Sequence, residues 1–107
     1  MSAAAPHDPI LRRFRAALDE VYGDRLERAV LFGSRARGDA HADSDYDVAV
    51  FLIGLTDRWD EARRLSVIET DILSETGAFI HSMPYPAGSY RQRTPLMHEI
   101  RREGVDL

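Results

Sequence analysis

The chain contains no cysteine and no lysine, and it has no hydrophobic run long enough to cross a bilayer. Without cysteine, it can form neither a disulfide framework nor a thiolate metal site. Without a long apolar run or a basic-then-apolar leader, it is expected to be a cytoplasmic protein with no membrane segment. All its basic residues are arginine, and the formal net charge of −4 argues against a direct nucleic-acid partner.

The 107 residues, 44% of them hydrophobic, suffice for one apolar core and therefore for a single domain over residues 1–107. Residues 1–7 show no periodicity and are expected to form a disordered terminus. The hydrophobic pattern of the remainder predicts an α+β fold, in which a small mixed sheet of at least three strands is flanked by helices in the order α-β-β-α-β-α. The strands are expected over 27–32, 45–53 and 78–83, and the helices over 9–22, 57–76 and 95–103.

Capping residues mark the ends of these helices. Asp8 and Thr94 each precede a proline, which is the usual order of an N-cap and a first helical position. The middle helix is expected to begin after Thr56 or Asp57 and to end at Gly77. Prolines at 84 and 86 are expected to end the third strand.

The stretch 33–50, with the sequence GSRARGDAHADSDYDVAV, holds the polar residues that suggest chemistry. Asp45 and Asp47 are two positions apart at the start of a strand, so their side chains leave the same face. Two neighbouring carboxylates repel each other unless a cation lies between them, and Mg²⁺ or Mn²⁺ suits oxygen ligands of this kind. Mg²⁺ typically binds one or two carboxylates together with substrate phosphates.

A second group of residues, at the end of the preceding strand, is suited to phosphate. Gly33 lets a ligand approach the backbone closely, and Ser34 adds a hydroxyl and an amide. Arg35 and Arg37 add positive charge. Each part also has an ordinary structural explanation: Gly-Ser can be a turn, the arginines can solvate a loop, and the aspartates can cap a strand.

A calcium loop is the main alternative for the acidic residues, because Asp43, Asp45 and Asp47 have D-x-D-x-D spacing. Such a loop requires glycine at its sixth position and glutamate at its twelfth. Those positions hold Val48 and Gly54, and Val48 begins a hydrophobic run. The calcium loop is therefore rejected.

Gly33-Ser34, ten intervening residues and then Asp45-Tyr46-Asp47 resemble the G-S-x(10)-D-x-D signature of minimal nucleotidyltransferases, which belong to the polymerase-beta-like superfamily. The resemblance extends over the leading helix, both motif strands, the long helix and the C-terminal segment. It implies a polymerase-beta-like nucleotidyltransferase fold.

The resemblance also implies roles for single residues. Asp45 and Asp47 would hold Mg²⁺ or Mn²⁺ and the triphosphate of ATP, and Gly33 and Ser34 would bind its phosphates. Arg35 and Arg37 match a basic pair common in the family.

The family implies in-line attack on the α-phosphorus of the nucleotide with release of pyrophosphate, and metal ions that stabilise the attacking and leaving oxygens. Similar proteins are often antitoxins encoded beside a HEPN-domain ribonuclease toxin, and some transfer AMP from ATP to a tyrosine of that toxin. By this resemblance, the chain is expected to form a hetero-oligomer with a HEPN toxin and to act on it by AMPylation.

The sequence departs from the family at one place. The superfamily usually has a third acid on the next strand, but the expected strand 78–83 has none. Phe79 or His81 stands nearest that position, and His81 could replace a ligand or a base, although a histidine near a strand end is more often structural. Glu69 and Asp71 lie in the preceding helix, which is the wrong element.

The missing acid leaves two functions open. The chain is either an Mg²⁺-dependent protein adenylyltransferase or a catalytically weak or inactive antitoxin that neutralises its toxin by binding. Transfer to a small molecule such as an antibiotic is disfavoured, because the enzymes that do so carry an added helical domain.

Overall fold

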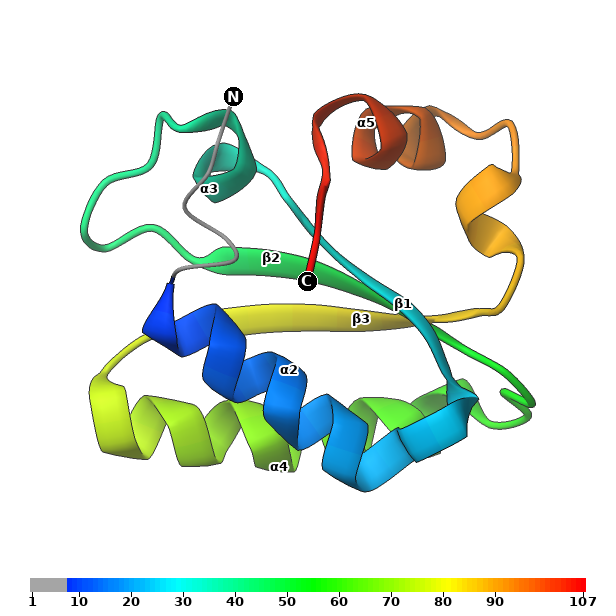
Figure 1. Ribbon diagram of the computed structural model, residues 1–107, viewed down its shortest axis with the longest axis horizontal. Helices are drawn as coiled ribbons and strands as arrows, with labels where there is room; N and C mark the ends of the chain where they lie inside the picture. The colour runs from blue at the N-terminus through cyan, green and yellow to red at the C-terminus, as the bar shows by residue number, and fades with distance from the viewer. Residues whose placement is uncertain (1–7) are drawn as a thin grey trace.

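The computed structural model describes residues 8–107, so the expectation for residues 1–7 lies outside the described residues. One sheet forms the centre of the molecule, with helices on both of its faces (Figure 1). No helix in the described part of the chain is long and apolar enough to cross a membrane.

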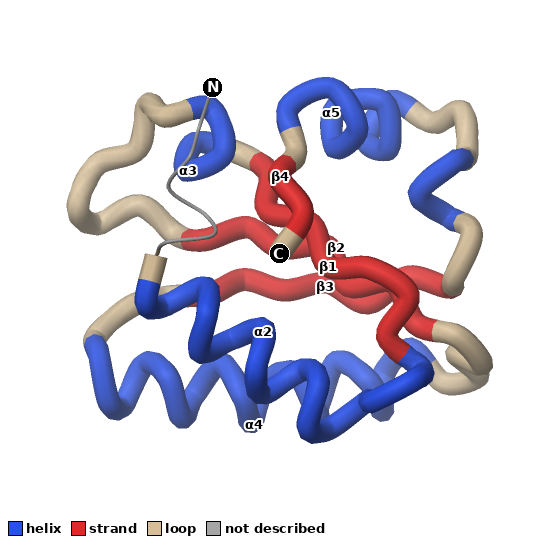
Figure 2. Tube along the Cα trace, viewed as in Figure 1, coloured by secondary structure: helices blue, strands red, loops and turns tan. Residues whose placement is uncertain are grey.

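The sheet has four strands in the order β3-β2-β1-β4 (Figure 2). β1 pairs antiparallel with both β2 and β4, whereas β2 and β3 run parallel. The sheet is therefore mixed, and the α+β class and the predicted order of elements are confirmed. The strands are β1 (Leu26–Phe32), β2 (Tyr46–Leu52), β3 (Ile80–Pro86) and β4 (Val105–Asp106).

Two long helices, α2 (Pro9–Tyr22) and α4 (Arg58–Thr76), lie together along one face of the sheet (Figure 1). α5 (Pro95–Glu103) packs on the opposite face, and the single turn of α3 (Ser34–Arg37) follows the end of β1. Two short 3-10 helices, η1 (Gly23–Arg25) and η2 (Ser89–Arg91), complete the elements. All three predicted helices are thus present.

The predicted caps form hydrogen bonds. The side chain of Asp8 accepts from the amide of Ile10 at 2.8 Å, and that of Thr94 accepts from the amide of Met97 at 3.1 Å. Of the two candidates for the middle helix, Asp57 is the cap, since its carboxylate accepts from the amides of Trp59 and Asp60 in the first turn of α4. Local chemistry thus fixes where these helices begin.

The core lies in two clusters, one on each face of the sheet. β2 contributes to both, and Val48–Leu52 are each 0% exposed, as a continuous apolar run in a central strand requires. The larger cluster lies beneath α2 and α4 and includes Phe14 and Leu65. The smaller cluster lies beneath α5 and contains Val30, Ala49, Phe51, Tyr85, Met97 and Ile100.

The third strand is predicted to end at Pro84 and Pro86, but β3 runs through Pro84 and ends only at Pro86. β3 is an edge strand, and the amides of alternate residues face opposite sides. Ala87 donates its amide inward to Leu52 at 2.9 Å, whereas Ser82 donates outward to a side chain of α4. Pro84 and Pro86 lie two and four positions after Ser82, so they face the same way as Ser82. The side on which each lacks an N–H group therefore points away from β2.

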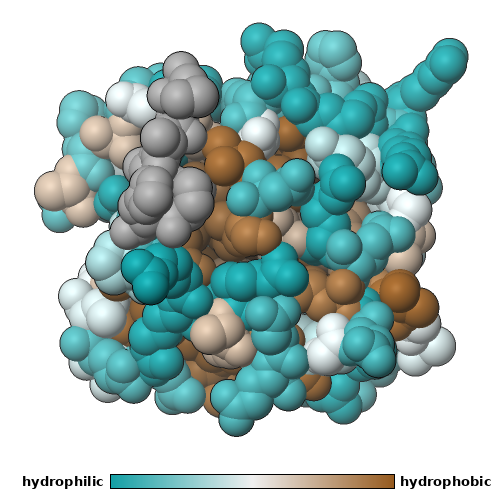
Figure 3. Space-filling view, viewed as in Figure 1, coloured by the Kyte–Doolittle hydropathy of each residue, from teal (hydrophilic) through white to brown (hydrophobic). Residues whose placement is uncertain are grey.

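Two further differences concern strand ends. The second strand begins at Tyr46 rather than at 45 and ends at Leu52 rather than at 53. The two-residue β4 is additional to the predicted strands, and it covers the outer edge of β1 at only two residue pairs. Figure 3 shows hydrophobic surface gathered in the middle of this side of the molecule, where Leu11, Ala16 and Leu107 line a hollow beside β4.

Candidate functional site

Gly33 and Asp47 lie against each other although 14 positions separate them. The antiparallel register of β1 and β2 pairs Phe32 with Asp47, so the end of one strand adjoins the start of the next. Gly33 has a φ of 77°, and a Cβ atom there would lie 2.6 Å from the Asp47 Oδ2 atom. Both the backbone conformation and the space exclude other residues. The two halves of the motif therefore form one site.

Asp45 and Asp47 lie at the start of β2, close enough for the charge of Asp45 to act on Asp47. Asp45 precedes β2 and is exposed, whereas the Asp47 side chain is 33% exposed. Partial burial raises the pKa of Asp47, and the charge of Asp45 adds to this rise; His81 and Arg37 oppose it. Burial and a like charge both penalise the ionised carboxylate, so a cation between these groups would relieve the penalty.

His81 is the residue of β3 that stands beside this pair. The parallel register of β2 and β3 pairs it with Asp47, and its Nδ1 atom lies 3.7 Å from the Asp47 Oδ1 atom. Phe79, the other candidate, precedes β3 and is 59% exposed, and its carbonyl accepts from the Tyr46 amide. The position next to the carboxylates therefore belongs to an imidazole.

The acids and histidines of residues 8–107 form no ready-made cluster of three metal ligands. A divalent cation held by Asp45 and Asp47 alone would take its remaining ligands from water or substrate. That requirement fits Mg²⁺ or Mn²⁺, which bind through one or two carboxylates together with phosphate oxygens. Asp45 and Asp47 fit this role, because one is desolvated and they repel each other.

The turn after β1 faces the carboxylates with backbone groups. The Gly33 carbonyl accepts from the amides of Ala36 and Arg37, which closes the turn of α3. Ser34, half-buried, is the first residue of that turn, next to the Gly33–Asp47 contact. The assignment of the Ser34 hydroxyl and amide to phosphate remains a prediction.

Glu103 is a part of this site that the sequence reasoning missed. Its Oε1 atom accepts from the Gly33 amide at 2.9 Å, and both carboxylate oxygens lie 3.3 Å from Arg37 Nη1. Its side chain is only 10% exposed. The available signal was its spacing, because Glu103 follows Met97 and Ile100 on the buried face of α5 at intervals of three.

The two arginines of the motif are engaged within the protein. The guanidinium of Arg35 donates to the carbonyls of His41, Ala42 and Ser44 at 2.9–3.3 Å and lies 4.0 Å from the centre of the Tyr46 ring. It thus holds the loop that leads to Asp45. Its assignment to phosphate remains a prediction.

Arg37 is more exposed and connects α3 to α5. Its Nε atom lies 3.2 Å from Asp39, and its Nη1 atom contacts Glu103. These two carboxylates raise the pKa of Arg37. Its charge also acts on Asp47, so its predicted place beside the site is compatible with this geometry.

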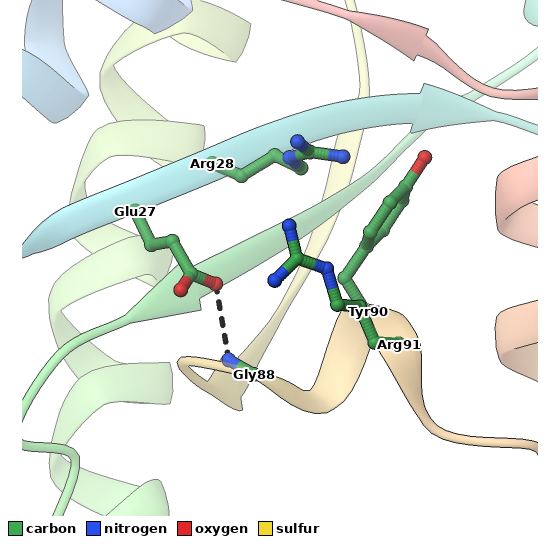
Figure 4. A pocket seen from close by; sticks show the side chains of 5 residues that line it. All are labelled: Glu27, Arg28, Gly88, Tyr90 and Arg91. Carbon is green, nitrogen blue, oxygen red and sulfur yellow. Dashed lines mark hydrogen bonds between the residues drawn. The ribbon is translucent and has the colours of Figure 1, made fainter.

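A separate hollow lies at the other end of β1, lined by Glu27, Arg28, Gly88, Tyr90 and Arg91 (Figure 4). Two of its charged side chains already have partners: Glu27 accepts from the Gly88 amide at 3.0 Å, and the Arg28 guanidinium lies 4.0 Å from the centre of the Tyr90 ring. We therefore interpret this hollow as structural and the carboxylate end of the sheet as the candidate site.

Comparisons with known proteins identify the family of the chain. The family model described as polymerase beta, nucleotidyltransferase, matches residues 20–106. A protein of Methanocaldococcus jannaschii, described provisionally as a protein adenylyltransferase, is 40% identical over 43 residues, which are 40% of this chain and 43% of that protein. The match thus spans less than half the length of this relative.

Solved structures share the fold. A toxin–antitoxin complex with AMP-PNP has a TM-score of 0.63 at 20% identity, over 89% of this chain and 69% of that chain. A Sulfolobus solfataricus protein, described provisionally as a nucleotidyltransferase, has a TM-score of 0.61 at 21% identity, over 99% and 86%. A mutant of the MntA-HpeT toxin-antitoxin has a TM-score of 0.61 at 18% identity, over 89% and 69%. At these identities, the likeness concerns the fold alone.

Proposed function

The chain belongs to the polymerase beta nucleotidyltransferase family, and on that premise we propose that it transfers AMP from ATP to a hydroxyl of a partner protein. The observation that supports the proposal is the close approach of Gly33 to Asp47, which brings the Gly33-Ser34 turn next to the Asp47 carboxylate. The acceptor oxygen would attack the α-phosphorus, lose its proton and displace pyrophosphate.

We propose separate roles in metal and phosphate binding for the residues of the site. Asp45 and Asp47 would hold Mg²⁺ or Mn²⁺, which supplies positive charge for the triphosphate. Gly33 and Ser34 would position the phosphates from the other side. Arg37 adds positive charge at the rim of the site, while Arg35 fixes the loop that carries Asp45.

We further propose that the partner is a HEPN-domain toxin and that the acceptor is a tyrosine of it. This follows the resemblance of the motif to minimal nucleotidyltransferases, and it is supported by the fold shared with chains of toxin–antitoxin complexes. The protein would then be an antitoxin that acts within a hetero-oligomer.

A second candidate function has its own observation. In β3, as the structure describes it, no acid stands beside Asp47, and the Gly33 amide is already bound by Glu103. Both features favour an antitoxin that binds its toxin without efficient transfer. Transfer of AMP requires the carboxylates of Asp45 and Asp47, whereas neutralisation by binding alone does not.

The experiment uses ATP labelled at the α-phosphate, Mg²⁺ or Mn²⁺, and the product of the neighbouring gene. We expect label on that partner and a fall of about 100-fold or more for Asp47→Asn, since a metal-held phosphate is worth several kcal/mol in the transition state. Asp43→Asn is the matched control, because Asp43 lies in the same loop and is exposed. It should keep full transfer.

The outcomes separate the two functions. If no label is transferred while both Asp45→Asn and Asp47→Asn still neutralise the partner, the enzyme proposal fails and the binding function stands. Calorimetry with α,β-methylene ATP, in which the bond to be broken is replaced, measures nucleotide binding without turnover. Loss of that binding in Asp47→Asn would support the placement of the triphosphate.

A further inference from the structure

We propose that His81 supplies the third protein ligand of the divalent cation and that its nitrogen turns the preference of the site from Mg²⁺ toward Mn²⁺. The inference rests on the proposed function, because it concerns the cation that Asp45 and Asp47 would hold with the nucleotide. The proposed ligand is the imidazole of His81, whereas the family resemblance implies a carboxylate at this position of β3.

The position of His81 is set by the sheet. Because β2 and β3 are parallel neighbours and Asp47 pairs with His81, their side chains leave the same face. The Nδ1 and Oδ1 atoms are 3.7 Å apart, too far for a direct hydrogen bond. Two ligands each about 2.1 Å from one ion can lie up to about 4.2 Å apart, so a single cation can contact both.

His81 is also available for this role. Its side chain is 64% exposed, and among the contacts of residues 8–107 its one charged neighbour within ion-pair distance is Asp47. The adjacent residues of β3, Ile80 and Ser82, point to the other face and are buried. The imidazole is therefore free to turn toward a cation without disturbing the core.

Nearby acids that could take this place are committed elsewhere. The Glu69 carboxylate binds both the amide and the hydroxyl of Ser82 on the outer edge of β3. The Glu103 carboxylate binds Gly33 and Arg37. Neither carboxylate can reach the cation without giving up these bonds, which leaves His81 beside Asp47.

The donor type decides the metal. Imidazole nitrogen suits transition metals, and for such sites Mn²⁺ binds more weakly than the later metals of the series, whereas Mg²⁺ prefers oxygen and keeps its waters. A neutral imidazole in place of a carboxylate also removes one negative charge, which weakens the attraction for both cations, so the nitrogen donor alone distinguishes them. A site with two carboxylates and one imidazole should therefore select Mn²⁺ over Mg²⁺.

The test measures metal binding directly. Free Mn²⁺ is followed by electron paramagnetic resonance while it is titrated into the protein with α,β-methylene ATP, and Mg²⁺ is then added as a competitor. We expect His81→Ala to weaken Mn²⁺ binding by about tenfold or more, a loss of the size seen when metal-site residues are removed. We expect His81→Asp to restore an oxygen donor and reduce the advantage of Mn²⁺ over Mg²⁺.

His98→Ala is the control, because His98 is an exposed histidine of α5 that lines a different hollow. It should bind Mn²⁺ as the unaltered protein does. Thermal unfolding of each variant verifies that it is folded, and the exposure of His81 makes a folding defect unexpected.

Failure of this proposal is distinguishable from failure of the proposed function. If Asp47→Asn abolishes Mn²⁺ binding but His81→Ala leaves it unchanged, His81 is no ligand and the nucleotidyltransferase proposal stands. If His81→Ala stops label transfer while Mn²⁺ binding is unchanged, His81 acts elsewhere and the proposal is also overturned. If the unaltered protein with the ATP analogue binds neither metal, both proposals fall.

Discussion

The two faces of the sheet are covered to different degrees. The face beneath α2 and α4 carries the larger apolar cluster, in which Phe14 and Leu18 are 0% exposed. On the face beneath α5, Phe51 is fully buried, but Phe32 and Met83 are only partly so. Two long helices thus cover one face, while one short helix leaves part of the other exposed.

The charged residues of the site lie on the less covered face. Asp47 and His81 lie on this face near the start of β2, and each has its side chain partly or largely exposed. A carboxylate pair would be costly beneath α2 and α4, because burial there offers neither water nor a cation. The fold thus buries most of its apolar side chains on one face and leaves the charged side chains of the candidate site accessible on the other.

The largest expected effect tests the difference in coverage. Phe14→Ala should lower the free energy of unfolding by about 3–5 kcal/mol, because it opens a cavity in the enclosed face. Met97→Ala, in the smaller cluster beneath α5, should cost less, toward about 2 kcal/mol, because the neighbouring structure can relax. Urea denaturation gives both values, and a larger loss for Met97 would contradict the comparison.

Gly33→Ala should have the next largest effect, about 1–3 kcal/mol, because alanine meets both a positive φ and the Asp47 carboxylate. Gly54→Ala is the control: Gly54 has a φ of 72°, but a Cβ atom there would meet nothing within 4 Å. The excess cost at Gly33 measures the contact with Asp47. Adding Asp47→Ala should recover part of that excess, and a purely additive double variant would exclude the contact.

Local chemistry made much of the fold predictable from the sequence. Asp8, Asp57 and Thr94 cap helices through bonds that span two or three residues, so the sequence alone locates them. The spacing of Asp45 and Asp47 likewise predicts a shared side of the sheet. Where the relevant contact is close in sequence, the pattern carries the information.

Contacts between distant segments were not predictable in this way. Glu103 binds Gly33 across 70 positions, and nothing near either residue indicates the other. The continuation of β3 through its prolines depends on its place at the sheet edge, which follows from the strand order. The bonds of Arg35 to loop carbonyls were not predictable either, because backbone carbonyls carry no side-chain signal.

Glu103→Ala should lower the free energy of unfolding by about 1–2 kcal/mol, because it leaves the Gly33 amide and Arg37 without their buried partner. Glu99→Ala is the control, one turn earlier in α5, where an exposed pair with Arg102 should contribute less than about 0.5 kcal/mol. Equal losses would show that Glu103 is an ordinary surface residue. Amide hydrogen exchange at Gly33 should quicken in Glu103→Ala alone.

The smallest effect concerns the charge of Asp47. Its pKa is raised in the folded state, so its favourable contribution is present below the pKa of the unfolded chain and is lost as pH rises through the higher folded value. Without metal, Asp47→Asn should therefore stabilise the protein at neutral pH, by less than about 0.5 kcal/mol because the side chain is partly exposed. Thermal unfolding at several pH values would show this gain shrinking toward acid.

Metal and nucleotide should reverse that order. With Mn²⁺ and α,β-methylene ATP, the unaltered protein should gain stability from binding and Asp47→Asn should not. The melting temperature of the unaltered protein should therefore rise above that of Asp47→Asn. Asp43→Asn should follow the unaltered protein in both conditions, because Asp43 is exposed and lies outside the site. If Asp47→Asn stayed the more stable of the two with both ligands present, the open face would hold no cation, and its incomplete covering would need another explanation.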